Sequence, residues 1–94
     1  MNPVPSNPDP RVTIVIPVYD KLEFTRPCLE SLAATLPPGW AEVVVVDNAS
    51  TDGTAEWLRD HAPWVRVITN TTNVGFARAS NMGAAIARTP YVLS

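Results

Sequence analysis

Four consecutive valines, residues 43–46, run directly into Asp47 and then into a polar turn. β-Branched residues favour extended backbone, and an apolar run without polar alternation is typical of a strand covered on both faces. Such strands belong to parallel sheets, in which ligands bind beyond the carboxyl ends of the strands. Asp47 stands at such an end. We therefore expect its carboxylate to accept a hydrogen bond from a bound ligand.

The same strand-to-turn pattern occurs near the N-terminus, where Tyr19 and Asp20 follow an apolar run. Segments with helical spacing of apolar residues separate the predicted strands. The predicted strands cover 12–18, 42–46, 65–69 and 91–93, and the predicted helices cover 21–35, 53–60 and 76–88. Strands that alternate with helices indicate right-handed crossovers. The predicted fold is therefore α/β, a parallel sheet with helices on both faces in the order β-α-β-α-β-α-β.

The first predicted helix has a local start signal and an obstacle. Asp20 offers an N-cap, and Glu23 three residues later completes a capping-box pattern. Pro27 has no N–H and is tolerated only near the first turn, which allows a helix start as late as Phe24. For the second helix, each of residues 50–52 offers a cap. Both predicted helix starts thus lie directly after the carboxyl ends of strands.

Composition limits the classes of protein that this chain can belong to. Its 94 residues form one domain at most, and no run of about 20 apolar residues is present to span a membrane. The net charge of −2, without a basic run, argues against a nucleic-acid partner. A single cysteine, Cys28, fits a reducing, cytoplasmic compartment and is predicted to be a small buried residue. Residues 1–10 contain four prolines and no signal-peptide pattern, so they are predicted to form a flexible tail before the folded residues 11–94.

Several short motifs follow one another along the folded part of the chain. They are VTIVIPVYD (12–20), CLESL (28–32), VVDNASTDGT (45–54), NVGFA (73–77) and NMG (81–83). In this order and at this spacing, the chain from residue 11 to residue 94 resembles the N-terminal, donor-binding part of a family 2 glycosyltransferase with the GT-A fold. The NVGFA stretch is most similar to the rhamnosyltransferase-like branch.

The resemblance implies a nucleotide-diphosphate sugar as donor, of the UDP or dTDP type. In the family, the turn after the first strand and the acid after the second hold the nucleoside, which here are Pro17, Tyr19 and Asp47. A carboxylate accepts the imide N–H of uracil or thymine, and Tyr19 can pack against the base. Gly75 would let the backbone approach the nucleotide because it has no Cβ. Arg78 would face the diphosphate as a cation.

The resemblance also implies a divalent metal, manganese or magnesium, for the full-length parent. In the family an Asp-X-Asp-like motif directly after the fourth strand binds this ion, and the chain ends at Ser94, about where the motif would begin. The acidic catalytic base lies further on, where it activates a hydroxyl of an acceptor glycan or lipid-linked sugar. No metal ligand or base is therefore assigned, and we expect residues 1–94 to bind donor without transferring sugar. Such an acceptor is compatible with a parent peripheral to the inner membrane face.

Each candidate residue also has a structural interpretation. Asp47 could end its strand as a turn former, Tyr19 could be a half-buried packing residue, and Arg78 could be a solvated helix residue. The chain as a whole could be a non-catalytic module that binds a nucleotide or a partner. A dinucleotide-dependent oxidoreductase is disfavoured, because no Gly-X-Gly-X-X-Gly follows the first strand and no glycine precedes Gly39.

The fourth predicted strand, residues 91–93, raises a question of association. In the resembled fold it lies beside the first strand, and its outer edge would carry unpaired N–H and C=O groups. Such an edge templates pairing with another strand. We therefore expect the chain either to self-associate through this edge or to be marginally stable, because a short chain buries a small fraction of its surface.

Overall fold

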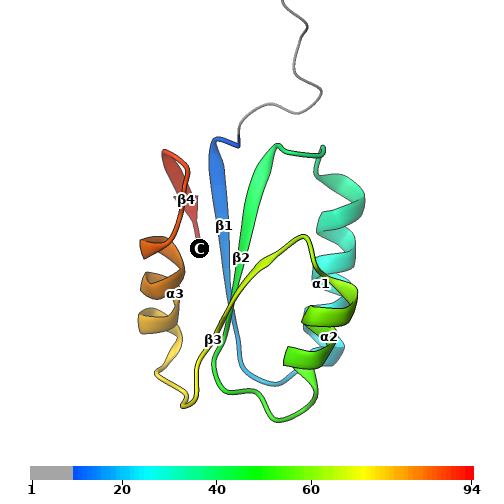
Figure 1. Cartoon of the computed structure of the whole chain (residues 1–94), viewed down its shortest axis with the longest axis vertical. Coiled ribbons are helices and arrows are strands. Elements are labelled where there is room, and N and C mark those ends of the chain that lie inside the picture. The colour runs from blue at the N-terminus through cyan, green and yellow to red at the C-terminus, as the bar shows by residue number, and fades with distance from the viewer. Residues whose placement is uncertain (1–9) are drawn as a thin grey trace, which may run out of the picture.

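The computed structural model describes residues 10–94, so the predicted tail, residues 1–10, lies outside the described residues except for its last residue. Strands and helices alternate along the described part of the chain (Figure 1). They are β1 (Val12–Val18), α1 (Leu22–Thr35), β2 (Ala41–Asp47), α2 (Thr54–His61), β3 (Arg66–Thr69), α3 (Phe76–Ala85) and β4 (Tyr91–Leu93). Each predicted element is present, and its ends differ from the prediction by a few residues at most.

The strands form one parallel sheet in the order β3-β2-β1-β4. α1 and α2 cover one face of this sheet, and α3 covers the other (Figure 1). The predicted α/β fold with helices on both faces is confirmed, as is the position of β4 beside β1. No helix among residues 10–94 is long and apolar enough to cross a membrane.

The valine run of β2 is buried on both faces of the sheet. Val43 and Val45 pack in the layer beneath α1 and α2, whereas Val44 and Val46 pack in the layer beneath α3. The first layer holds Val18, Leu29, Val43, Val45, Leu58, Ala62 and Val65, and the second holds Val15, Val44, Val46 and Ala79. Helices on both faces thus explain the unbroken apolar run, and the run ends at Asp47 on the carboxyl edge of the sheet.

The close approach of α3 to the sheet depends on Gly83. A Cβ at this position would lie 2.4 Å from Val15 Cγ1 and 3.2 Å from Val46 Cγ2. We expect Gly83→Ala to lower the free energy of unfolding by about 1–3 kcal/mol, because overpacking outweighs the better helix propensity of alanine. Urea unfolding followed by tryptophan fluorescence measures this change.

Truncation of the opposing side chain provides the control for this prediction. In a Val15→Ala background the nearest contact of the new methyl group is absent. Gly83→Ala should therefore cost less stability there than in the native chain. Equal costs in both backgrounds would contradict the packing argument.

Helix α1 begins before Phe24, the latest start that Pro27 allowed in the sequence prediction. It starts at Leu22, not at Phe24, and it includes Pro27 beyond its first turn. Pro27 is exposed, so water can reach the carbonyl that loses its helical N–H partner. Cys28 is exposed as well, and the prediction that it is buried is wrong. The buried stripe of α1 passes through Thr25 and Leu29, and Cys28 lies beside this stripe.

The predicted capping box of α1 is also wrong. Lys21, not Asp20, occupies the N-cap position, and its side chain makes no capping hydrogen bond. The Leu22 N–H instead donates to Asp52 Oδ2 at 2.9 Å, an acceptor from the loop before α2. The first turn of α1 is therefore capped from a neighbouring loop and not by the sequence pattern Asp20–Glu23.

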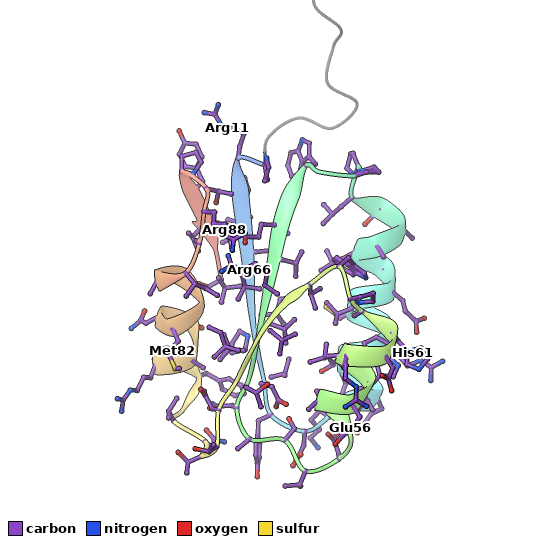
Figure 2. The ribbon with its side chains drawn as sticks, viewed as in Figure 1. Arg11, Glu56, His61, Arg66, Met82 and Arg88 are labelled. Carbon is purple, nitrogen blue, oxygen red and sulfur yellow. The ribbon has the colours of Figure 1, made fainter. Side chains whose placement is uncertain are left out.

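A polar network at the amino end of the sheet holds the connection from α3 to β4. Glu42 pairs with Arg66 and accepts hydrogen bonds from Thr13 Oγ1 at 2.9 Å and from the Arg88 N–H at 3.2 Å. Figure 2 shows Arg66 and Arg88 near each other at this end. Burial raises the pKa of Glu42, but the hydrogen bonds from Arg66, Arg88 and Thr13 bring the net pKa below its ordinary value. This acid is fully engaged and plays a structural role.

Candidate functional site

Three loops meet at the carboxyl edge of the sheet, at the bottom of Figure 1. They follow β1, β2 and β3 and comprise residues 19–21, 48–53 and 70–75. The parallel register places Val18 opposite Asp47. The turn that carries Tyr19 therefore lies directly beside the acid that ends β2.

A shallow hollow of about 290 Å³ opens at the end of β1. Its walls include Pro17 and Tyr19 from the strand and its turn, Phe24 and Cys28 from α1, and Phe76 from the start of α3. Tyr19 has 43% of its surface exposed, and Phe24 and Phe76 have more than half exposed. The sheet edge thus offers an open, largely aromatic surface suited to a flat, partly apolar ligand group.

Pro17 fits in β1 because its nitrogen, which carries no hydrogen, faces away from β2, on a side of the strand where no residue among 10–94 pairs with it. The Val18 carbonyl accepts a hydrogen bond from the Asn48 N–H at 2.8 Å, so the polar backbone groups of Val18 face β2. Backbone groups of the preceding residue face the opposite side, where β4 pairs with β1 only as far as Ile14. Among residues 10–94, Pro17 therefore interrupts no ladder bond.

Asp47 is almost fully buried, with 1% of its surface exposed. Its Oδ1 accepts the Ser50 N–H at 3.0 Å, which closes the turn after β2. Within residues 10–94 no fully buried side-chain nitrogen or oxygen lacks a hydrogen-bond partner. Because Oδ2 has no partner among these residues, Oδ2 must be the oxygen that reaches the surface. Asp47 thus closes the turn through Oδ1, and its Oδ2 accepts no hydrogen bond from residues 10–94; Asp47 is not among the residues that line the hollow.

Asn48 is the central polar residue of this edge, and the sequence reasoning did not single it out as a site residue. Its side chain, 1% exposed, donates to Asn73 Oδ1 at 2.9 Å and accepts from the Val74 N–H at 3.0 Å and from Asn70 Nδ2 at 3.1 Å. It also donates to the Gly75 carbonyl at 3.3 Å. Asn48 therefore fastens the loop after β3 to the end of β2.

Gly75 and Arg78 occupy different positions relative to this edge. Gly75 has a φ of 86° and a ψ of 159°, a conformation that residues with a side chain rarely adopt. An added Cβ would meet nothing within 4 Å, so the backbone angle and not crowding requires glycine here. Arg78 is exposed on α3 and makes no hydrogen bond or ion pair within residues 10–94. The structure thus joins Gly75 to Asn48 and leaves Arg78 as a free cation among these residues.

A second acid at this edge, Asp52, is engaged by the chain itself. Asp52 accepts hydrogen bonds from the Leu22 N–H, the Thr54 N–H and Thr54 Oγ1. Burial raises the pKa of Asp52, but these hydrogen bonds outweigh it and hold the pKa below its ordinary value. In residues 10–94 no three His, Cys, Asp or Glu side chains group to hold a metal ion. The described residues by themselves therefore do not form a site for a divalent cation.

Parallel α/β sheets bind their ligands beyond the carboxyl ends of the strands, and Tyr19 and Asp47 lie at these ends of β1 and β2. The sequence pattern described as "Glycosyl transferase family 2" matches residues 13–94. The chain therefore belongs to glycosyl transferase family 2, as its motifs predicted.

Relatives and solved structures agree with this assignment. The undecaprenyl-phosphate mannosyltransferase of Micrococcus luteus is 38% identical over 72 residues, which cover 73% of this chain and 29% of that protein. The mannosyltransferase PcManGT from Pyrobaculum calidifontis, in complex with GDP-Man and Mn2+, has a TM-score of 0.69 and 32% identity over 92% of this chain and 28% of that chain. S. aureus TarS 1-349, in complex with UDP, has a TM-score of 0.78 and 29% identity over 88% of this chain and 26% of that chain. The chain thus spans less than a third of each of these proteins.

Proposed function

We propose that this chain forms the donor-nucleotide part of a glycosyltransferase site, and that the whole protein transfers a sugar from a nucleotide diphosphate to an acceptor hydroxyl. The observation that carries the proposal is the exposed ring of Tyr19 on an open hollow, one strand away from the free acceptor of Asp47. Structural neighbours in complex with GDP-Man and with UDP support a donor of this chemical class. No observation favours the alternative of a non-catalytic module.

Different residues at the edge contact different parts of the nucleotide. The ring of Tyr19 packs on the base, and Pro17 forms the adjoining wall. Asp47 Oδ2 accepts a hydrogen bond from the base edge. Gly75 offers an open backbone position, and Arg78, which has no partner among residues 10–94, is the cation for the diphosphate.

Uracil or thymine is the base that this edge fits best. Both carry one imide N–H for Asp47 Oδ2, whereas adenine carries no imide N–H. Guanine carries a comparable N–H, and the neighbour with GDP-Man shows that a related protein takes a guanine nucleotide. An imide-type N–H alone therefore does not separate uracil from guanine, and the nucleotide titration measures the preference of UDP over GDP.

A titration with four nucleotides tests this proposal. We expect UDP and dTDP to bind more tightly than GDP and ADP, with NMR shift changes at Tyr19 and Asp47. Affinities should be modest because much of the donor site of a complete transferase lies outside this chain. Shift changes that avoid Tyr19 and Asp47 for every nucleotide would exclude the site, and tighter binding of ADP would exclude the role of Asp47.

The remaining partners belong to the whole protein. We propose that it uses manganese or magnesium, as the presence of Mn2+ in a structural neighbour suggests, with ligands from outside residues 10–94. We propose a glycan or a lipid-linked sugar as its acceptor. A single cysteine and a cytosolic type of donor favour a cytoplasmic place of reaction, with the protein peripheral to the inner membrane face.

We further propose that isolated copies of the chain associate through β4. This strand is the last in the sheet order, and Tyr91, Val92 and Leu93 have 64%, 39% and 59% of their surfaces exposed. The Tyr91 N–H donates to the Arg11 carbonyl at 3.2 Å, so the N–H of the next residue, Val92, points away from β1. An outward donor on an apolar edge strand favours pairing with a second copy.

Sedimentation velocity over a concentration series measures this association. We expect a dimer that Val92→Pro disrupts, because proline removes the outward donor without removing a bond to β1. Val67→Pro is the matched control: Val67 is also 39% exposed, and its N–H points outward from β3 at the opposite edge. A monomer at all concentrations, or equal effects of the two prolines, would refute association through β4.

A further inference from the structure

Two acids at the carboxyl edge make reciprocal hydrogen bonds between neighbouring loops. Asp20, in the loop after β1, accepts the Thr51 N–H on Oδ1 at 2.6 Å. Asp52, in the loop after β2, accepts the Leu22 N–H on Oδ2 at 2.9 Å. Each loop therefore supplies the acceptor that the backbone of the other needs, over a sequence separation of about 30 residues.

A third link runs from this pair to the acid proposed to read the base. The Asp20 N–H donates to Ser50 Oγ at 2.7 Å, and the Ser50 N–H donates to Asp47 Oδ1 at 3.0 Å. Asp20 directly follows Tyr19 in the chain. A continuous set of hydrogen bonds thus connects the Asp47 carboxylate to the backbone that carries the Tyr19 ring.

The backbone of the first loop needs such support. Asp20 and Lys21 have φ values of 51° and 60°, and Ala49 in the second loop has a φ of 70°. Residues other than glycine adopt this left-handed region at a cost, so other contacts must hold it. Among residues 10–94 the Tyr19 hydroxyl has no hydrogen-bond partner, and its ring is half-exposed. The backbone of Tyr19 therefore sets the point and direction from which the ring projects, without a hydrogen bond of the hydroxyl to residues 10–94.

We propose that Asp20 and Asp52 are positioning residues that lock the two loops into one unit and so hold the Tyr19 ring beside Asp47. The effect on nucleotide binding rests on the proposed function, whereas the locking of the two loops does not. The two carboxylates act as acceptors for backbone N–H groups and not as metal ligands or ligand contacts. Their effect on a bound nucleotide passes through Tyr19.

A double-mutant cycle with UDP as the probe tests this route. We expect Asp20→Ala and Asp52→Ala each to weaken UDP binding about tenfold, which corresponds to about 1.4 kcal/mol. In a Tyr19→Ala background the same changes should have little further effect, because the ring that they position is gone. Asp20→Asn keeps the Oδ1 acceptor. It should therefore bind UDP as tightly as the native chain does, unlike Asp20→Ala.

Glu23→Gln is the matched control, because it removes one negative charge from the first turn of α1 at an exposed side chain. It should leave UDP affinity unchanged. The proposal is overturned if the losses of UDP affinity in Asp20→Ala and Asp52→Ala add fully to the loss in Tyr19→Ala. It is also overturned if Asp20→Asn loses as much UDP affinity as Asp20→Ala. Both results would indicate an effect of charge or of general stability.

A ligand-free measurement separates this proposal from the nucleotide assignment. In Asp52→Ala without UDP, the Leu22 amide should exchange faster with solvent, and the Tyr19 ring resonances should move toward averaged values. Unchanged Tyr19 resonances would refute the positioning role. If the native chain fails to bind UDP while the Tyr19 resonances respond as expected, the proposed function is wrong and the positioning role stands.

Discussion

Replacing Asn48 with alanine is expected to lower the free energy of unfolding by about 2–3 kcal/mol, a large share of the stability of a small domain. The change removes an almost fully buried side chain that contacts four groups of the loop after β3. The Val74 N–H loses its partner inside the protein, whereas Asn73 Oδ1 keeps the hydrogen bond from the Gly75 N–H, and a buried polar group left unpaired is costly. Urea unfolding followed by tryptophan fluorescence measures this change in the free energy of unfolding.

Asn81→Ala is the control for this experiment. Asn81 is exposed on α3 and has no hydrogen-bond partner among residues 10–94. Its replacement should change stability by less than about 0.5 kcal/mol, in the range typical of surface sites. Similar losses in the two variants would show that Asn48 is not the residue that fastens this loop.

The second large effect concerns binding. Asp47→Asn should weaken UDP binding by roughly 10- to 150-fold, because a charge-assisted hydrogen bond contributes about 1.5–3 kcal/mol. Asparagine keeps an oxygen for the Ser50 N–H and places a donor amide where Oδ2 lies, opposite the imide N–H of uracil. Binding of ADP, which has no imide N–H, should change little. Calorimetric titration of both nucleotides measures the difference.

Stability and charge need separate controls in this comparison. Thermal melting should show similar midpoints for the native chain and for Asp47→Asn, since the turn after β2 keeps its hydrogen bond. Asp60→Asn removes one negative charge from the exposed end of α2 and should leave both affinities unchanged. A parallel loss of UDP and ADP affinity in Asp47→Asn would refute base reading by this carboxylate.

The sheet, and the edge of it that carries the candidate residues, follow from local sequence signals. The valine run, residues 43–46, predicts a strand covered on both faces, and the structure buries it in two layers. Alternation of strands and helices predicts parallel pairing, which brings Tyr19 and Asp47 to one edge. Local periodicity and the rules for parallel sheets suffice for these features.

The hydrogen bonds between the loops at this edge have no comparable local signal in the sequence. The capping pattern of Asp20 and Glu23 satisfies the local rule, yet the acceptor for the first turn of α1 comes from Asp52, 30 residues away. Asn48 follows a strand as any turn former would. Its partners lie in residues 70–75, and only the pairing of β2 with β3 brings them near. Hydrogen bonds between loops depend on register, which a single sequence does not display.

Intermolecular nuclear Overhauser effects between UDP and the isotopically labelled chain test the central claim most directly. The proposed site predicts contacts between the uracil H5 and H6 protons and the ring protons of Tyr19, together with a shift of the Asp47 amide resonance. Contacts of the uracil protons with residues away from the loops after β1 and β2, or none to Tyr19 at saturating UDP, would contradict the account.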